Sequence, residues 1–273
     1  MARKTHAERR EAGMEIQSSL RGGGSDPEAT AAETEARLGA IGSFVVDFAL
    51  GEVWTRPGLA RRDRSLVVIS ILATLNQLNQ LHRHVQGGIN HGLTRTEIEE
   101  VFVQLAGYAG FPRAIDATTT AQEALAEMEG VDRLEPSPAA ERKDDDQRSA
   151  DARAVLGRLS ENQPPGGIGV DMGSFTGPGG RFAFGELWAR EHLSRRDRSL
   201  VVCATLTTQD KPTELRFHLQ AAINHGVTPE ELEELMVTVI AYVGFPTAVE
   251  GFRALREVEA RQPGTPRSRS IIS

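Results

Sequence analysis

One stretch of the chain, residues 51–114, occurs twice, and this repetition limits the possible architectures more than any other feature of the sequence. Moved forward by 134 positions, it falls on residues 185–248 without a gap, and roughly half of the paired positions are identical. A period of this length is too long for a solenoid repeat, and it matches the size of a small domain. The sequence therefore predicts a duplicated domain.

The repeated stretch predicts helices and no strands. Residues 61–75 begin with charges and continue as an apolar run, which indicates a buried helix. Residues 78–90 form the next expected helix, and Gly92 follows it, where glycine accepts a left-handed backbone at no steric cost. Capping boxes at Thr94–Glu97 and Thr228–Glu231 open further helices. The expected fold class is all-α, in two tandem helical domains.

Composition changes mark the expected boundaries of these domains. Residues 1–30 are polar and glycine-rich, so we expect a disordered or loosely attached arm. A helix is expected over residues 33–50, ended by Gly51, with a loop over residues 52–59. The expected domains are residues 31–130 and 150–262, joined by a linker at 131–149 that is rich in proline and aspartate, and followed by an unstructured tail at 263–273. The copies differ most at residues 164–180, which are rich in glycine and proline.

The overall composition excludes several classes of protein. The formal net charge is −7, which argues against nucleic acid as a partner. No apolar run has membrane length, and the N-terminus lacks the apolar core of a signal peptide, so a cytoplasmic protein is expected. The single cysteine, Cys203, lies in an apolar run and is expected to be a small buried side chain without a disulfide.

Two histidines, His84 and His218, are the first candidates for chemistry. They occupy paired positions in the repeat, although their neighbours differ between the copies. Each lies in the middle of a helix on a closely packed apolar face, and burial can tune the pKa of an imidazole to either side of neutrality. The alternative is a structural core histidine. His91 and His225 are instead expected to cap helices near the C-terminal dipole, where a cation is favoured. The histidines are spaced too far apart along their helices for a shared metal, so no metal site is expected.

Other repeated polar and aromatic residues complete the expected sites. Glu52 and Glu186 each lie near a tryptophan, and an aromatic wall can raise the pKa of a carboxyl group so that it donates a proton. Arg64 and Arg198 open the buried helices and could clamp a carboxylate, or could pair with a neighbouring acid. The other residues of each Arg-Arg-Asp-Arg run are expected to be solvated. The candidates for contact with a substrate are Trp54, Trp188, Tyr108 and Tyr242.

Several reaction types are poorly supported. None of the three lysines is matched between the copies, which disfavours a Schiff base. No glycine-rich phosphate loop occurs between a strand and a helix. Acid–base chemistry that uses Glu, His and Arg without a cofactor remains, and so does binding without chemistry.

A set of motifs in order resembles the γ-carboxymuconolactone decarboxylase family. These motifs are Gly-Glu-Val-Trp-x-Arg-Pro-Gly-Leu at 51–59, Arg-Ser-Leu at 64–66, His84, Gly-x-Thr-x-x-Glu-Ile-x-Glu at 92–100 and Tyr-Ala-Gly-Phe-Pro at 108–112. The resemblance covers both copies. It implies an all-α fold that assembles into rings, commonly of six domains. We therefore expect a homotrimer, in which three chains supply six domains.

The departures from the family pattern bear on function. The resemblance implies that a peroxidase branch carries Cys-x-x-Cys shortly before the histidine, but Gln77 and Gln80 stand there, and Lys211 and Glu214 stand in the second copy. A second histidine of the decarboxylase branch is replaced by Gln104 and by Thr238. The second copy also has Glu191-His192 in place of Pro57-Gly58.

The resemblance implies a decarboxylase that acts on a cyclic carboxylate or lactone. In this mechanism Arg64 orients the acid, His84 donates to the oxyanion or the carbon, and Glu52 positions the proton; Arg198, His218 and Glu186 have these roles in the second copy. One alternative is a related isomerase or lyase that acts on a keto-acid or polyketide-like molecule. Another is an oligomer that binds a ligand without turnover.

Overall fold

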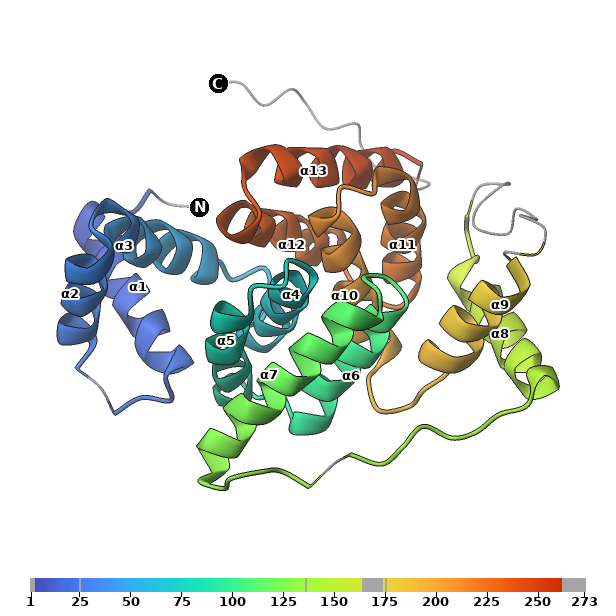
Figure 1. Ribbon diagram of the computed structural model, residues 1–273. Coiled ribbons are helices and arrows are strands. Elements are labelled where there is room, and N and C mark those ends of the chain that lie inside the picture. The colour runs from blue at the N-terminus through green and yellow to red at the C-terminus, as the bar shows by residue number, and fades with distance from the viewer. Residues whose placement is uncertain (1–2, 25, 136, 164–173, 175, 262–273) are drawn as a thin grey trace.

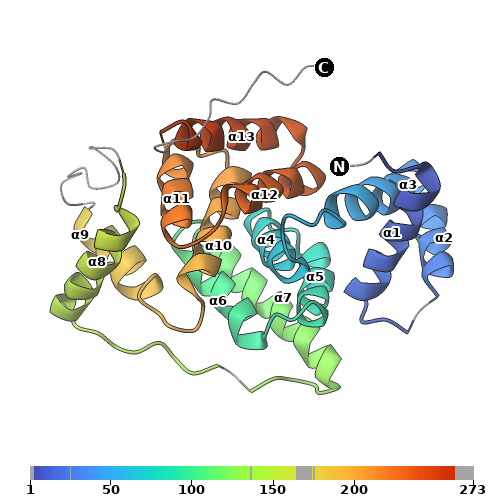
Figure 2. The same cartoon turned by 180° about the vertical axis from the view of Figure 1, so that it is seen from behind.

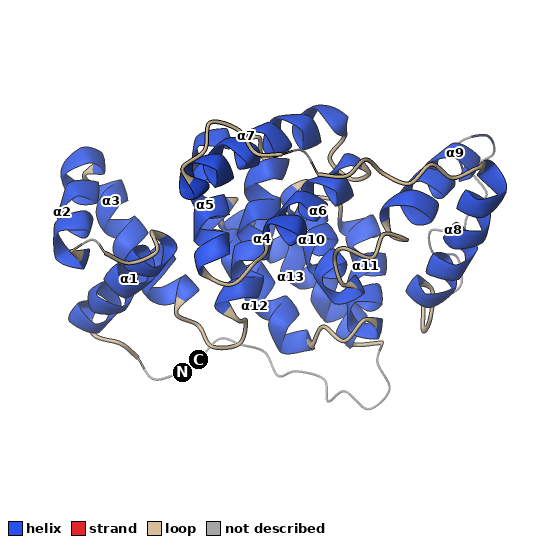
Figure 3. Ribbon diagram, turned by 90° about the horizontal axis from the view of Figure 1, so that it is seen from below, coloured by secondary structure: helices blue, strands red, loops and turns tan. Residues whose placement is uncertain are grey.

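The computed structural model describes residues 3–24, 26–135, 137–163, 174 and 176–261. The described residues form helices and connections, with no strand among them, as Figure 3 shows by colour. The expected differences at 164–180 and the expected tail fall largely or wholly on residues outside this description. The all-α fold predicted from the repeat is confirmed.

The centre of the molecule is a bundle of eight helices, four from each copy. The first copy supplies α4 (Arg61–Thr74), α5 (Leu78–Asn90), α6 (Arg95–Ala106) and α7 (Phe111–Glu129). The second copy supplies α10 (Arg195–Thr208), α11 (Pro212–Asn224), α12 (Pro229–Tyr242) and α13 (Phe245–Glu259). Figure 1 shows these two groups packed against each other.

The first helix of each group, α4 or α10, packs against its counterpart at the centre of the bundle. Both helices are apolar nearly all round, and almost every residue of each is buried. Cys203 lies within α10 and is fully buried, as expected. Because the two copies share this core, the two tandem domains pack into one folded unit.

A second set of helices flanks the bundle on opposite sides. On one side are α1 (His6–Leu20), α2 (Pro27–Leu38), α3 (Ala40–Phe44) and the π-helix η1 (Val45–Trp54). On the other are α8 (Asp145–Leu159), α9 (Thr176–Gly180) and the π-helix η3 (Arg181–Leu187). Figures 1 and 2 show the two flanks from opposite directions.

The expectation of a disordered arm over residues 1–30 is wrong. Thr5 and Glu8 form a capping box that begins α1, and Ile16 of α1 is fully buried. This segment has few apolar residues, so its sequence gave little indication of a packed helix. In the structure, Ile16 lies where η1 packs against α1. The first copy therefore begins at α1, the counterpart of α8.

Gly51 does not end a helix as expected, because it lies inside η1, and its counterpart Gly185 lies inside η3. A Cβ on Gly51 would lie 2.2 Å from the carbonyl oxygen of Arg9, and one on Gly185 would lie 2.1 Å from that of Arg148. Each glycine therefore lets the backbone of α1 or α8 cross directly over a π-helix. The expected loop at 52–59 accordingly starts only after Trp54.

The linker is shorter than expected. Asp144 caps α8, which begins at Asp145, so the second copy starts before residue 150. The preceding segment runs along the bundle from the end of α7 to α8 (Figure 1). None of the described helices is long and apolar enough to cross a membrane.

Candidate active site

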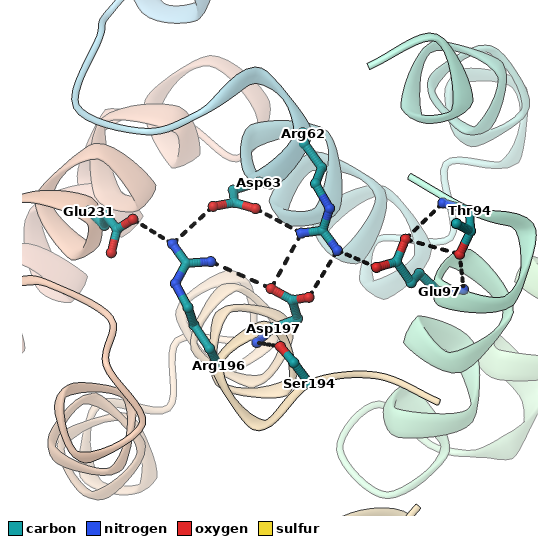
Figure 4. Close-up of polar contacts among 8 residues, drawn as sticks. All are labelled: Arg62, Asp63, Thr94, Glu97, Ser194, Arg196, Asp197 and Glu231. Carbon is teal, nitrogen blue, oxygen red and sulfur yellow. Dashed lines mark hydrogen bonds and ion pairs between the residues drawn. The ribbon is translucent and has the colours of Figure 1, made fainter. Parts of the chain in front are cut away.

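Four charged residues meet where the N-termini of α4 and α10 face each other (Figure 4). Arg62 binds Asp197 at 2.9 Å, and Arg196 binds Asp63 at 2.9 Å, so each arginine pairs with the aspartate of the other copy. Glu97 and Glu231, the capping-box acids of α6 and α12, contact the same arginines. Both aspartates are buried. The expectation that these residues are solvated is wrong, because the duplication places each run against its copy.

The sites themselves are built around the two mid-helix histidines. The indole of Trp54 stacks on His84, with ring centroids 5.9 Å apart and planes 19° apart. The Trp54 Nε1–H donates to the phenol oxygen of Tyr242 at 2.8 Å, and this oxygen lies 3.4 Å from Nε2 of His84. Trp54 and His84 belong to the first copy and Tyr242 to the second. One polar chain thus connects the two copies.

The same arrangement occurs at the paired positions. Trp188 stacks on His218 with centroids 5.9 Å apart, and its Nε1–H donates to Tyr108 at 2.7 Å. The Tyr108 oxygen lies 3.4 Å from Nε2 of His218. Each histidine therefore has a tryptophan from its own copy and a tyrosine from the other copy. Trp54, Trp188, Tyr108 and Tyr242, which the sequence suggested as contacts for a substrate, thus lie beside the histidines, and their contact with a substrate stays a prediction.

Burial sets the protonation state of these groups. It lowers the pKa of His84 to about 4 and the pKa of His218 to about 3. Burial also raises the pKa of Tyr108 and Tyr242 above the usual range of a phenol. At neutral pH each site therefore holds a neutral imidazole and a neutral phenol.

The contacts of the phenol oxygens are compatible with the Nδ1–H tautomer of both histidines. Because the indole N–H occupies one acceptor position of the phenol oxygen, the phenol proton is free to point at Nε2. In that tautomer the imidazole proton lies on Nδ1, and Nδ1 of both His84 and His218 is buried with no hydrogen-bond partner among the described residues. A buried donor without an acceptor is costly, and such an atom is common at a functional site.

The arginines Arg64 and Arg198 are held by the opposite copy. Arg64 is fully buried, and it donates to Glu234 at 3.1 Å, to Thr238 at 2.7 Å and to the carbonyl oxygen of Arg56 at 3.1 Å. Glu234 also binds Arg56 at 2.7 Å. Burial alone would raise the pKa of Glu234, but the hydrogen bonds from both arginines outweigh it and hold this pKa below its usual range.

The second copy repeats this ion cluster with one difference. Arg198 donates to Glu100 and to the carbonyl oxygen of Arg190, both at 2.9 Å. Its remaining contact is Gln104 Oε1 at 2.9 Å, where the first cluster has a threonine hydroxyl. Both buried guanidinium groups are thus engaged by the protein. Their contacts suit a positioning role better than direct binding of a substrate.

The glutamates of the repeated motif lie apart from the histidines. Glu52 is exposed and pairs with Arg9 of α1 at 3.1 Å. Glu186 pairs with Arg148 of α8 at 2.8 Å. The structure therefore brings together the expected histidines, tryptophans and tyrosines, and it places these two carboxylates at the contacts between π-helix and flanking helix.

His91 and His225 stand at the ends of α5 and α11, but they do not act as cations. Burial lowers the pKa of His91 to about 4 and lowers that of His225 as well. The Nδ1 atom of His91 lies 2.8 Å from the hydroxyl of Ser65, and that of His225 lies 2.9 Å from Ser199. These neutral rings connect helices, and they do not offset the helix dipole with a charge.

The two histidine sites differ in their access to solvent. His218 is 2% exposed, and the buried Phe217 packs its ring edge-on against it with centroids 5.2 Å apart. His84 is only partly buried, and the neighbouring position holds the exposed Arg83. The first site is thus the more accessible of the two.

A model of the "Carboxymuconolactone decarboxylase family" matches residues 40–123 and 180–257, one region in each copy. The chain belongs to this family. The resemblance seen in the motifs is therefore confirmed for both copies, and the matched regions contain all the residues of the two histidine sites. Within the described part of the chain, no three His, Cys, Asp or Glu residues are grouped to hold a metal ion.

Two relatives of this chain are both named as decarboxylases, but of different acids. The chain is 38% identical over 86 residues to the 4-carboxymuconolactone decarboxylase of Acinetobacter baylyi, which covers 32% of this chain and 64% of the relative. It is 36% identical over 85 residues to the nitrosuccinic acid decarboxylase npaB of Metarhizium robertsii, which covers 31% of this chain and 59% of the relative. The chain thus spans less than two thirds of the length of either relative.

Sequence reasoning missed the carboxylates Glu100 and Glu234 as members of the sites. Their signal was present, because they occupy paired positions of the repeat and end the motif that begins at Gly92 or Gly226. An acidic residue within an amphipathic helix is normally interpreted as solvent-exposed, even when both copies of a repeat have it. Only the structure shows which residues of the other copy it faces. Here each faces two arginines of the other copy.

Proposed function

We propose that this protein is a decarboxylase that uses no cofactor and acts on a carboxylate whose electrons can delocalise into a lactone or a similar group. The observation that carries this proposal is the neutral His84, stacked on Trp54 and adjoining Tyr242, with an Nδ1 atom that has no partner among the described residues. Membership of the family and the names of both relatives support the same reaction type.

A site for this reaction must support the breaking of a carbon–carbon bond, the stabilisation of an oxyanion and the return of a proton. The bond between the carboxylate carbon and the neighbouring carbon breaks, carbon dioxide leaves, and the electron pair moves onto an electron-withdrawing group as an oxyanion. A proton then returns to the carbon, so that one proton is taken up from solvent in each turnover. A preorganised donor aimed at the oxyanion lowers the barrier most, because the negative charge develops there.

His84 is suited to this donor role. With a pKa lowered to about 4 it is neutral at pH 7, so Nδ1–H offers a hydrogen bond instead of a permanent charge. The phenol of Tyr242 holds Nε2 and fixes the tautomer, and it gives a path for the proton. We assign Arg64 and Glu234 to positioning this group, and Glu52 to holding η1 against α1.

More than one acid fits this reaction type. The two relatives are named for different acids at similar identity. Gln104 and Thr238 bind the buried arginines at the positions where the decarboxylase branch was expected to carry a histidine. A related isomerase or lyase acting on a keto-acid or polyketide-like molecule is therefore the second candidate.

The test is turnover by the purified protein. We expect carbon dioxide release from 4-carboxymuconolactone, nitrosuccinate or another acid of this class, with loss of activity in His84→Gln. Full activity in a His84→Gln, His218→Gln double variant would remove the imidazoles from the mechanism. Ligand binding without release of carbon dioxide or formation of an isomer would instead support a non-catalytic binding protein.

We also propose that three chains assemble into a ring of six domains. The last bundle helix of each copy, α7 or α13, exposes a large apolar side chain at a paired position: Phe111 is 56% exposed and Phe245 is 65% exposed. Ile115, one turn after Phe111, is 60% exposed. Such patches mark contact surfaces. Light scattering on the purified protein should give the mass of three chains, and the mass of one chain would contradict the proposal.

A further inference from the structure

Two apolar grooves, one in each copy, are built from paired residues of the repeat. The first lies between α6 and α7 and has a volume of about 390 Å³. The second lies between α12 and α13 and has a volume of about 540 Å³. Phe111 and Ile115 of the first groove correspond to Phe245 and Val249 of the second. The duplication therefore allows the surroundings of the two grooves to be compared directly.

The first groove is partly covered by other segments of the same chain. Phe182 of η3 packs on Phe111 of α7, with ring centroids 5.5 Å apart. Phe182, Leu187 of η3 and Ala140 of the linker line this groove together with α6 and α7. A groove of this kind thus accepts an aromatic side chain from a flanking π-helix.

The second groove has no such cover among the described residues. Its lining comes from α12 and α13 alone in this part of the chain, and it includes Val237, Ile240 and Phe252. Phe48 of η1 corresponds to Phe182, but it does not belong to this lining. The second groove is therefore an apolar surface without the aromatic residue that its counterpart binds.

The first flank carries apolar side chains that have the opposite need. Ile41 and Phe44 of α3 are each 64% exposed, and Phe48 of η1, which continues α3, is 39% exposed. A spacing of three and four residues places these three side chains on one side of the helical segment. We call them the flank stripe. Contiguous apolar surface of this kind is rare on a monomer and marks a contact with another molecule.

We propose that the flank stripe of one chain binds in the α12–α13 groove of a second copy of this chain. The stripe supplies the kind of side chain that Phe182 supplies to the first groove. Stripe and groove are different surfaces of one chain, and a closed ring of three chains requires a contact between two different surfaces. This inference rests on the three-chain assembly proposed above, and it names the contact that would hold the ring together.

Substitutions on both sides of the contact test this inference. A Phe44→Ser, Phe48→Ser double variant and a separate Phe245→Ser variant should each have the mass of one chain in sedimentation, at a concentration where the unsubstituted protein has the mass of three. The dissociation constant of the assembly should rise more than about tenfold, because aromatic anchors at the centre of an interface are lost. Phe182→Ser is the matched control, since Phe182 packs within its own chain. It should lower the thermal unfolding midpoint and keep the mass of three chains.

Cross-linking tests which surfaces meet. Cys203 is the single cysteine and is fully buried, so new surface cysteines can be linked selectively. A Phe44→Cys protein and a Val249→Cys protein are mixed at a dilution that dissociates them, concentrated again and treated with a bismaleimide. Linked dimers should form in the mixture and in neither protein alone. Helix content measured by circular dichroism shows whether each variant is folded.

The possible results separate this inference from the other proposals. Linked dimers of a single variant, or no linked dimers in the mixture, would overturn it. A mass of three chains in the folded Phe44→Ser, Phe48→Ser variant would also overturn it and leave the ring itself in place. A mass of one chain for the unsubstituted protein would refute both. None of these measurements depends on release of carbon dioxide, so the proposed decarboxylation stands or falls separately.

Discussion

The phenol oxygen of Tyr242 lies 3.4 Å from Nε2 of His84, although 158 residues separate them in the chain. The histidine comes from the first copy and the tyrosine from the second. The indole of Trp54 binds the same oxygen at 2.8 Å, so the tyrosine has a fixed position between two groups of the other copy. A single copy of the repeat cannot make this site.

Removing the phenol hydroxyl should separate its structural and chemical roles. Tyr242→Phe and Tyr108→Phe each leave a buried indole N–H without an acceptor, and should lower the free energy of unfolding by about 1–3 kcal/mol. Urea unfolding measures this loss. If the first copy alone is active, Tyr242→Phe should also lower kcat and Tyr108→Phe should not. Equal activity losses in the two variants would speak against that assignment.

Stability should fall as the pH falls from about 6.5 to 4. In the unfolded chain a histidine has a pKa near 6.5, whereas burial holds that of His84 at about 4 and that of His218 at about 3. Between these values the unfolded state binds more protons than the folded state, so stability rises with pH across this window and the contribution is complete above about 6.5. Unfolding in urea at pH 7.5 and pH 5 measures the slope.

A histidine that cannot titrate should flatten this dependence. His218→Gln should reduce the stability difference between pH 7.5 and pH 5 by about 1–2 kcal/mol. His192→Gln, at an exposed position, serves as the control and should leave the difference as it is in the wild type. An identical slope in wild type and His218→Gln would contradict the neutral buried imidazole.

The repeated glycines should tolerate no larger side chain. Gly51→Ala and Gly185→Ala place a Cβ about 2 Å from a backbone oxygen of α1 or α8, and should cost about 1–3 kcal/mol because the flanking helix must move away. Gly157→Ala is the contrasting change. Gly157 lies inside α8 with open space around its Cβ position, so alanine should stabilise the protein by about 0.5–1 kcal/mol. Thermal unfolding of the three variants compares these effects.

The charged cluster of Figure 4 should behave as one unit. Asp197→Ala removes one of the three carboxylates that bind the partly buried Arg62. The free energy of unfolding should therefore fall by about 3 kcal/mol. A double-mutant cycle with Arg62→Ala should give a coupling energy of about 1–3 kcal/mol. Additive effects of the two changes would show that the cluster does not join the copies energetically.

Local patterns in the sequence were sufficient for the helices of the bundle. The predicted starts at Arg61, Thr94 and Thr228 agree with the structure, because caps and helical spacing act over a few residues. The same local reasoning failed at residues 1–30 and at Gly51. In both cases the deciding contact is made by a segment about 40 residues away, with Ile16 packed in the core and Gly51 under the backbone of Arg9.

The sequence alone determined that the domain is duplicated and that it is all-α. It also determined that His84, Trp54 and Tyr108 have equivalent residues 134 positions later. Only the tertiary structure decided that the copies exchange side chains, so that Tyr242 completes the site of His84 and Glu234 holds Arg64. A repeat fixes which residues correspond, but it carries no information on which surfaces face each other. That choice follows from burying the apolar helices α4 and α10 against one another, which brings each set of polar residues to the other copy.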